Sequence, residues 1–189
     1  MLIASEICNQ YSDRDLVKKA MEDIDFFSCI YERYEKRLMI YIKRLSKATD
    51  EEARDILQES FIKIWKNLNA IDLDLKLSSW IYRIVHNEVI SRWRKTSHVQ
   101  PSIPLTDHLI EDLTHEVLHD EEYEKILQQV VKEIPEKYRE VIILKYFENM
   151  SYEEISDILK IPEGTVSVRL NRAKKIIEKE FRQTQKNRN

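Results

Sequence analysis

One glycine and four prolines stand among the 189 residues of this chain. Tight turns between strands usually need glycine, which tolerates positive φ, or proline, which fixes φ. A chain this poor in both lacks the turn residues of a sheet, and its apolar residues recur at the helical spacing i, i+3, i+4. The sequence therefore predicts an all-α fold with short polar connections.

Helical periodicity divides the chain into two blocks separated by an acidic stretch. Between Asp107 and Glu124 there are eight acidic residues and no Lys or Arg, and Pro101 and Pro104 lie just before them. Such a composition is typical of a linker. We therefore predict two small helical domains, with the chain divided into residues 1–23 (an N-terminal segment with a short helix), 24–96 (the first domain), 97–122 (the acidic linker), 123–182 (a second domain of four helices) and 183–189 (a polar tail).

Three longer helices are predicted in the first domain, over residues 25–46, 50–68 and about 78–95. Ser12 precedes an acidic turn and is suited to cap the N-terminus of the first short helix, and the helix over 50–68 is expected to open at Thr49 or Asp50. Two apolar stripes define the predicted core faces: Phe27, Ile30, Tyr31, Tyr34, Leu38, Tyr41, Ile42 and Leu45 on the first helix, and Ala53, Leu57, Phe61, Ile64, Trp65 and Leu68 on the second.

Several classes of function are disfavoured by what the sequence lacks. Cys8 and Cys29 have no CxxC spacing and the five histidines have no metal-ligand spacing, so neither a disulfide framework nor a zinc site is predicted. A nucleophile elbow and a glycine-rich phosphate loop are also missing, so we expect no enzymatic activity and no cofactor. No stretch of eighteen apolar residues and no leader pattern occur, which favours a cytoplasmic protein without membrane insertion.

The segment from Ser151 to Lys175 predicts a helix-turn-helix. Ser151 and Glu154 form a capping-box pattern, and Pro162 and Gly164 mark the turn before a second helix. Residues 160–188 hold nine Lys or Arg against three Glu, an excess of six positive charges that suits DNA phosphates. A helical hairpin with a solvated basic face is the alternative. The side chains expected to point outward from the second helix are Ser167, Val168, Asn171, Arg172 and Lys175.

The first domain carries two further polar surfaces. Asp55, Gln58 and Glu59 lie opposite the apolar stripe of their predicted helix, although acids early in a helix are also favoured by its dipole. The next helix combines cations with aromatic rings, a mixture that suits single-stranded nucleic acid. Its residues are Arg83, Arg92, Arg94 and Lys95 with Trp80, Tyr82 and Trp93, and at least one of the tryptophans is expected to anchor the core.

The runs Asp55–Trp65 and Ser79–Asn87 resemble conserved region 2 of the bacterial sigma factors. The runs Ile134–Tyr146, Ser151–Ile155 and Ile161–Ala173 resemble region 4. With only a short linker between these blocks, the chain resembles the extracytoplasmic-function (ECF) group. The resemblance implies a factor that binds core RNA polymerase, directs it to specific promoters and promotes promoter melting, and it implies an anti-sigma factor as a further partner.

Site residues follow from the resemblance by position. Asp55, Gln58 and Glu59 would bind core polymerase. The melted −10 element would be bound by Asn69, Ala70, Ile71, Arg83, Asn87, Arg92, Arg94 and Lys95, with a flipped base held by the loop and Asn87. The −35 element would be bound by Thr165, Ser167, Val168, Arg169, Asn171, Arg172, Lys174 and Lys175. The family often carries Arg or Lys and Ser where this chain has Ser167 and Val168, so the promoter sequence does not transfer.

Two other classes of protein remain compatible with the residues themselves. A helix-turn-helix repressor or activator would bind a symmetric operator without polymerase. A helical interaction protein would use its basic helix for an acidic partner and would show no salt-sensitive DNA affinity. The formal net charge of −3 disfavours a protein that coats nucleic acid by bulk attraction.

Overall fold

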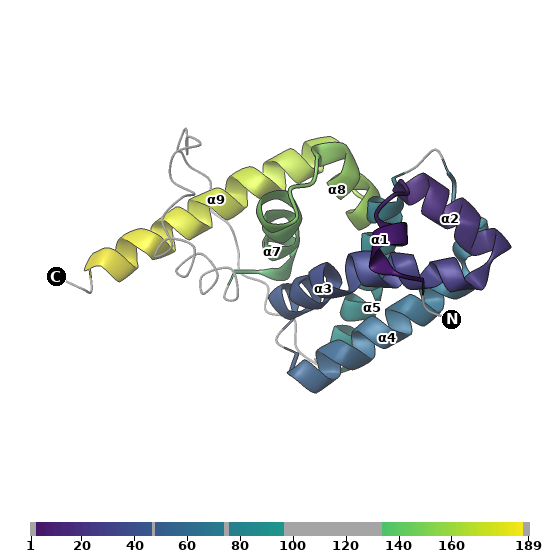
Figure 1. Cartoon of the computed structure of the whole chain (residues 1–189). Coiled ribbons are helices and arrows are strands. Elements are labelled where there is room, and N and C mark those ends of the chain that lie inside the picture. The colour runs from purple at the N-terminus through teal and green to yellow at the C-terminus, as the bar shows by residue number, and fades with distance from the viewer. Residues whose placement is uncertain (1–2, 47, 74–75, 97–133, 187–189) are drawn as a thin grey trace.

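A computed structural model describes residues 3–46, 48–73, 76–96 and 134–186 of the chain. Every regular element in these ranges is helical, as the glycine-poor sequence predicts. Figure 1 shows an N-terminal lobe that ends with α5 and a C-terminal lobe that ends with the long helix α9. The predicted linker and the helix predicted over residues 123–133 lie outside the described residues.

The N-terminal lobe contains five helices and two short 3-10 turns. Ser12 caps α2 by accepting from the Asp15 amide, as predicted. Thr49 and Glu52 form a reciprocal capping box that begins α4. The elements are α1 (Ser5–Cys8), α2 (Asp13–Glu22), η1 (Ile24–Phe26), α3 (Phe27–Leu45), α4 (Asp50–Lys66), η2 (Leu68–Ala70) and α5 (Leu77–Thr96).

The described part of the C-terminal lobe contains α7 (Glu136–Ile142), the π-helical turn η4 (Ile143–Phe147), α8 (Tyr152–Leu159) and α9 (Glu163–Lys186). Pro135 stands directly before α7, where its missing N–H costs no helical bond. Ser151 and Glu154 form the predicted capping box at the start of α8. Helix α9 packs on α7 and α8 and then projects beyond the rest of the lobe (Figure 1).

The two lobes meet on α5. Helices α3 and α4 pack on one side of α5, and α8 packs on another. Trp80, Ile81, Val85 and Val89 are buried in the resulting core, which is continuous between the lobes. Trp80 is therefore the core anchor that the sequence led us to expect, whereas Trp93 is exposed.

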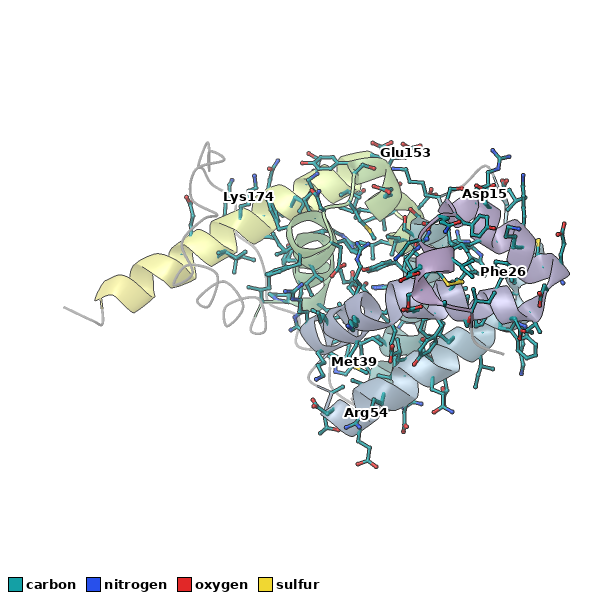
Figure 2. The ribbon with its side chains drawn as sticks, viewed as in Figure 1. Asp15, Phe26, Met39, Arg54, Glu153 and Lys174 are labelled. Carbon is teal, nitrogen blue, oxygen red and sulfur yellow. A yellow bond between two sulfur atoms is a disulfide. The ribbon has the colours of Figure 1, made fainter. Side chains whose placement is uncertain are left out.

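Cys8 and Cys29 form a disulfide, so the prediction that the two cysteines make no bridge is wrong. The bond joins α1 to α3 and is drawn in yellow in Figure 2. Tertiary packing of α1 against α3 brings together two residues that are 21 positions apart. No local spacing signals such a pairing, because the contact depends on how the chain returns after α2.

The turn between α8 and α9 does not depend on its glycine. Lys160 ends α8 in the left-handed conformation, with φ of 54°. Gly164 lies in the first turn of α9, has no positive φ, and leaves open space where a Cβ would be. The sequence places the glycine at the entry to the helix, but the unusual backbone conformation belongs to Lys160.

Replacing Gly164 with Ala should therefore stabilise the fold. Alanine restricts the unfolded chain and favours the helix, so the free energy of unfolding should rise by about 0.5–1 kcal/mol. Lys160→Gly is the matched variant and should also raise the free energy of unfolding, because glycine adopts the left-handed conformation without the steric cost that lysine has there. Urea denaturation of both variants checks the pair, and a loss of stability in Gly164→Ala would contradict the account of this turn.

Candidate functional site

Helices α8 and α9 form a helix-turn-helix with a packed inner face. Ile155 and Ile158 of α8 are buried against Val166 and Leu170 of α9. This packing fixes which side of α9 remains outside. Val168, Asn171, Arg172 and Lys175 are exposed and Ser167 is half-buried, so the outward face predicted from the sequence is confirmed as a surface. Thr165 is half-buried in the first turn of the helix.

Two cations predicted near phosphates turn instead toward the protein. The Arg169 side chain is only 25% exposed, and its Nη1 lies 3.7 Å from Oε2 of Glu140. The Nζ of Lys174 lies 5.8 Å from the centre of the Tyr146 ring. Both partners belong to the same lobe as α9, so Arg172 and Lys175 are the predicted cations of this face that remain exposed.

Helix α5 has three distinct faces. Tyr82 and His86, one turn apart, face the C-terminal lobe and are buried. Glu88 and Arg92, also one turn apart, face α4. The remaining strip carries Arg83, Asn87, Ser91 and Arg94, of which Arg83 is half-buried and the others are exposed. Residues at this spacing share one side of a helix, so the strip is a continuous polar surface.

The basic and aromatic surface predicted for α5 is smaller than expected. Arg92 pairs with Glu59 of α4 at 2.7 Å and with Glu88 at 3.6 Å, so one predicted DNA contact is bonded to one predicted polymerase contact. Tyr82 is buried and does not contribute to a surface. Trp93 and Arg94 are exposed. The side chain of Lys95 lies outside the described part.

The loop after α4 divides the three residues predicted to hold a flipped base. Asn69 and Ala70 are exposed in the 3-10 turn η2. Ile71 is buried, with 8% of its surface exposed, because it lies over α2 beside Val17 and Leu77. Its side chain supports the loop from within and is not part of the outer surface.

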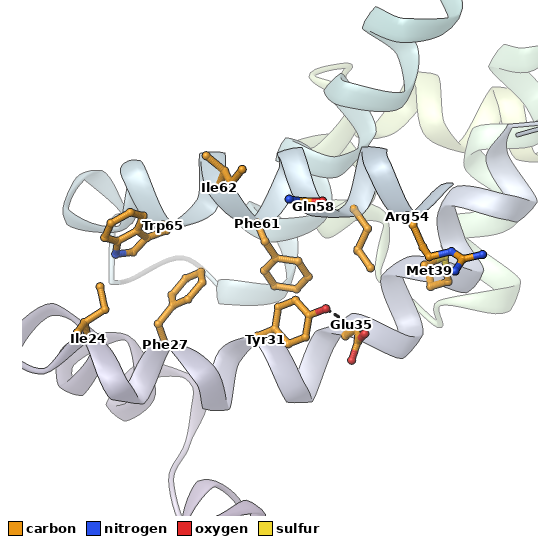
Figure 3. A pocket seen from close by; sticks show the side chains of 11 residues that line it. Ile24, Phe27, Tyr31, Glu35, Met39, Arg54, Gln58, Phe61, Ile62 and Trp65 are labelled. Carbon is orange, nitrogen blue, oxygen red and sulfur yellow. Dashed lines mark hydrogen bonds between the residues drawn. The ribbon is translucent and has the colours of Figure 1, made fainter. Parts of the chain in front are cut away.

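An apolar groove of about 580 Å³ runs between α3 and α4 (Figure 3). Tyr31 and Trp65, which the periodicity placed on core stripes, are 39% and 48% exposed along it. Gln58 lines the groove, and Asp55 and Glu59 are exposed on the same helix. The sequence signal for the groove is an excess of apolar residues on α3 and α4 over one stripe each. Its lining residues are Ile24, Phe27, Tyr31, Glu35, Met39, Arg54, Leu57, Gln58, Phe61, Ile62 and Trp65.

A chain of buried polar groups joins the lobes. The Tyr41 hydroxyl lies 3.0 Å from Nδ1 of His86, and Nε2 of His86 lies 3.6 Å from Oε1 of Glu140. Burial and, to a smaller extent, the charge of Arg94 together lower the pKa of His86 to about 4. Burial and the neighbouring Glu136 raise the pKa of Glu140 to about 7, opposed by Arg169. His86 is therefore neutral at pH 7, and its contact with Glu140 is not an ion pair.

A second set of contacts surrounds Glu148. The buried Tyr82 hydroxyl donates to Oε2 of Glu148, and Arg37 and Arg44 each lie 3.8 Å from its carboxylate. Nearby, Nη1 of Arg139 donates to the Leu45 carbonyl at 3.1 Å. Both lobes supply partners to these groups, so the interface satisfies most of the polar atoms that it buries.

The described ranges lack both a metal-binding cluster and a membrane-spanning helix. They contain no cluster of His, Cys, Asp and Glu suited to a metal ion. None of their helices is long and apolar enough to cross a bilayer. A helix-turn-helix with a basic outer face, joined to a lobe with a polar strip and an apolar groove, defines a DNA-binding protein that also has a surface for another protein.

Comparison with known proteins identifies the class. Residues 30–99 match the family Sigma-70 region 2, and residues 124–177 match Sigma-70, region 4. The chain is 34% identical over 177 residues to the ECF RNA polymerase sigma factor SigW of Bacillus subtilis, covering 88% of this chain and 93% of that protein. The chain therefore belongs to the ECF sigma factors, which are not enzymes and direct RNA polymerase to promoters. This membership excludes both alternatives that the residues alone left open.

Other similarities agree with this assignment. The RNA polymerase sigma-H factor of Pseudomonas aeruginosa is 28% identical over 186 residues, covering 90% of this chain and 94% of that one. The fold resembles CnrH, solved with the cytosolic domain of CnrY, with a TM-score of 0.68, 19% identity and coverage of 89% and 96%. It also resembles the sigma factor RpoE of Bartonella quintana, solved with the anti-sigma factor NepR, with a TM-score of 0.63, 23% identity and coverage of 82% and 96%.

Replacing Glu140 with Gln should change how stability depends on pH. In the parent, the unfolded chain loses the Glu140 proton near pH 4.5 and the folded chain near 7, so stability falls as pH rises through this window. His86 acts oppositely, because the unfolded chain binds its proton below about 6.5 and the folded chain only below about 4. Removing Glu140 abolishes the first of these two contributions to the pH dependence of stability, and the contribution of His86 stays.

The Glu140→Gln variant should accordingly gain stability relative to the parent between pH 4.5 and 7, by up to about 3 kcal/mol. Urea denaturation at several pH values measures the difference between the two proteins, so groups common to both cancel. Glu153→Gln, which alters an exposed acid on α8, is the control and should follow the parent. Parallel profiles for the parent and Glu140→Gln would contradict the burial of this carboxyl group.

Proposed function

We propose that the outward face of α9 reads the −35 element of the promoter in the major groove. The observation that carries this proposal is the set of exposed Asn171, Arg172 and Lys175 on a helix-turn-helix whose inner face is packed. Asn and Arg bond base edges, and Lys contacts phosphates. Ser167, Val168 and Thr165 lie beside them, and Arg169 and Lys174 reach phosphates only after leaving their contacts with the protein.

The η2 turn and three residues of the polar strip of α5 hold the melted −10 element, namely Arg83, Asn87 and Arg94. Asn87 and the exposed Asn69 and Ala70 capture a base that has left the stack, and Arg83 and Arg94 follow the backbone. Ile71 supports the turn from inside, and Arg92 fixes α5 to α4. Unstacking a base costs a few kcal/mol, which contacts to the captured base offset, so melting is favoured only at matching sequences.

The exposed side of α4 binds core RNA polymerase. Asp55, Gln58 and Glu59 lie on this side, and Gln58 borders the apolar groove. An apolar groove with a polar rim is typical of a surface that binds another protein. Polymerase then holds two weak DNA readers together, and each raises the effective concentration of the other on the promoter.

This proposal keeps the sequence-based division into residues 24–96, 97–122 and 123–182, with the helix over 123–133 completing a four-helix second domain. The acidic linker and the overall negative charge disfavour tight DNA binding by the free chain in the cytoplasm. The contacts of Tyr82 with Glu148 and of His86 with Glu140, which cross between the lobes, break when the lobes separate on polymerase. The solved relatives CnrH and RpoE, the latter bound by an anti-sigma factor, support an inhibitory protein partner for this chain as well.

Arg172→Ala tests the −35 assignment. If Arg172 contacts a base, the variant holoenzyme should bind a duplex promoter about 1–3 kcal/mol more weakly and discriminate less at one position. Lys175→Ala is the matched variant on the same face and should weaken binding about equally at all sequences. Affinities measured over a set of single-base promoter variants separate the two patterns. If Arg172→Ala weakens binding equally at all promoter variants, Arg172 contacts the DNA backbone and not a base.

Asn87→Ala tests the capture of a melted base. The holoenzyme should form open complexes about tenfold more slowly, a loss of about 1.4 kcal/mol, while its duplex binding is retained. Ser91→Ala, one turn further along the exposed strip, is the control and should resemble the parent. Permanganate reactivity of unpaired thymines measures melting. Equal melting rates for Asn87→Ala and the parent would refute the role of Asn87.

A further inference from the structure

The disulfide between Cys8 and Cys29 is not used by any step of transcription initiation described above. It joins the four-residue helix α1 to the middle of the N-terminal lobe. A helix of this length has no stability of its own, since the first turn alone is unfavourable to form. Helix α1 therefore depends on its attachments to the rest of the lobe.

Those attachments divide into two groups along the chain. Arg33 of α3 donates to the carbonyls of Cys8 and Tyr11 at 2.8 and 2.9 Å and pairs with Asp13 at 2.6 Å. These bonds hold the last residue of α1 and the segment that follows it. Before Cys8, the hydrogen bond from Ser5 to the exposed Glu32 is a surface contact. The disulfide is the covalent attachment of α1 itself.

Helix α1 and the residues before it form one wall of a groove on α3. Ile3, Ala4 and Ser5 line this groove from one side, and Phe27, Tyr31 and Glu35 of α3 line it from the other. These three α3 residues and Ile24 also line the apolar groove between α3 and α4. The position of α1 therefore decides the shape of a continuous surface that reaches Gln58 on the proposed polymerase-binding side of α4.

We propose that Cys8 and Cys29 are a reversible redox site that fixes α1 in the oxidised chain and releases it in the reduced chain. The oxidised form presents the complete groove and binds core polymerase more tightly, because a preordered wall lowers the entropy cost of association. The affinity change rests on the polymerase contact proposed for α4. The redox step itself rests only on the paired cysteines.

The chemistry is thiol–disulfide exchange with a small disulfide as oxidant. A thiolate of the pair attacks the small disulfide, which releases one small thiol and leaves a mixed disulfide on the protein. The second cysteine then attacks, the Sγ–Sγ bond forms and the second small thiol leaves, so two protons and two electrons pass to the oxidant. Reduction reverses these steps.

Cys8 is the sulfur that a reductant reaches first. Cys29 has no exposed surface, and Cys8 has 4%. Cys8 lies at the end of the four-residue helix α1, which has no stability of its own and therefore opens locally at low cost. Attack on Sγ of Cys8 expels Cys29 as a thiolate, which then takes up a proton.

The test uses the full chain equilibrated with oxidised or reduced glutathione. Thiol counting by alkylation and mass spectrometry should find no free thiol in the first state and two in the second. Amide exchange at residues 5–8 should be severalfold faster in the reduced chain. The oxidised chain should bind core polymerase severalfold more tightly than the reduced chain.

Cys8→Ser cannot form the bridge and should behave like the reduced chain in both buffers, and Cys8→Ala guards against an effect of the serine hydroxyl. Free thiols that persist under oxidation, or α1 exchange and polymerase affinity that ignore the redox state, would overturn the proposal. Failure of every form to bind polymerase would instead contradict the function proposed for α4. The thiol count and the exchange rates would then still decide whether the cysteines switch α1.

Discussion

The described structure depends on the burial of α5, which lies between α3 and α4 on one side and α8 on another. Its apolar residues face α3 and α4, and its Tyr82 and His86 face the C-terminal lobe. A helix enclosed in this way retains only a narrow polar strip for solvent or ligands. Asn87, Ser91 and Arg94 remain exposed because none of the helices in the described residues covers that side. The candidate DNA surface of the first lobe is thus a consequence of how both lobes pack.

Polar side chains lie among the apolar residues where the lobes meet, in a core that is continuous between them. Glu140 lies near His86 and Arg169, and Glu148 accepts from Tyr82. Groups that exchange protein partners for water can part at a smaller cost than apolar surfaces of the same area. These polar groups therefore lower the cost of separating the lobes.

The sequence predicted what depends on neighbouring residues. Capping by Ser12 and Ser151 and the inner face of α9 follow from spacing within one or two turns, and all are present. Prediction from the sequence failed for side chains whose neighbours come from distant segments of the chain. Burial of Tyr82 and Ile71, the pairing of Arg169 with Glu140, and the disulfide all depend on which helices meet. The family resemblance supplied residue roles, but it carried no information on these contacts.

The surfaces left over by packing differ in chemistry, and that difference separates their partners. The strip on α5 and the face of α9 are polar or cationic, which suits bases and phosphates. Along the groove, Ile62 and Trp65 remain 42% and 48% exposed, although burying apolar surface gains about 25 cal/mol per Å². Folding does not bury this apolar surface of α3 and α4, so its burial can stabilise association with another molecule. We therefore propose the groove as the surface for a protein partner, so that the anchoring of α1 beside it bears on affinity for that partner and not on DNA recognition.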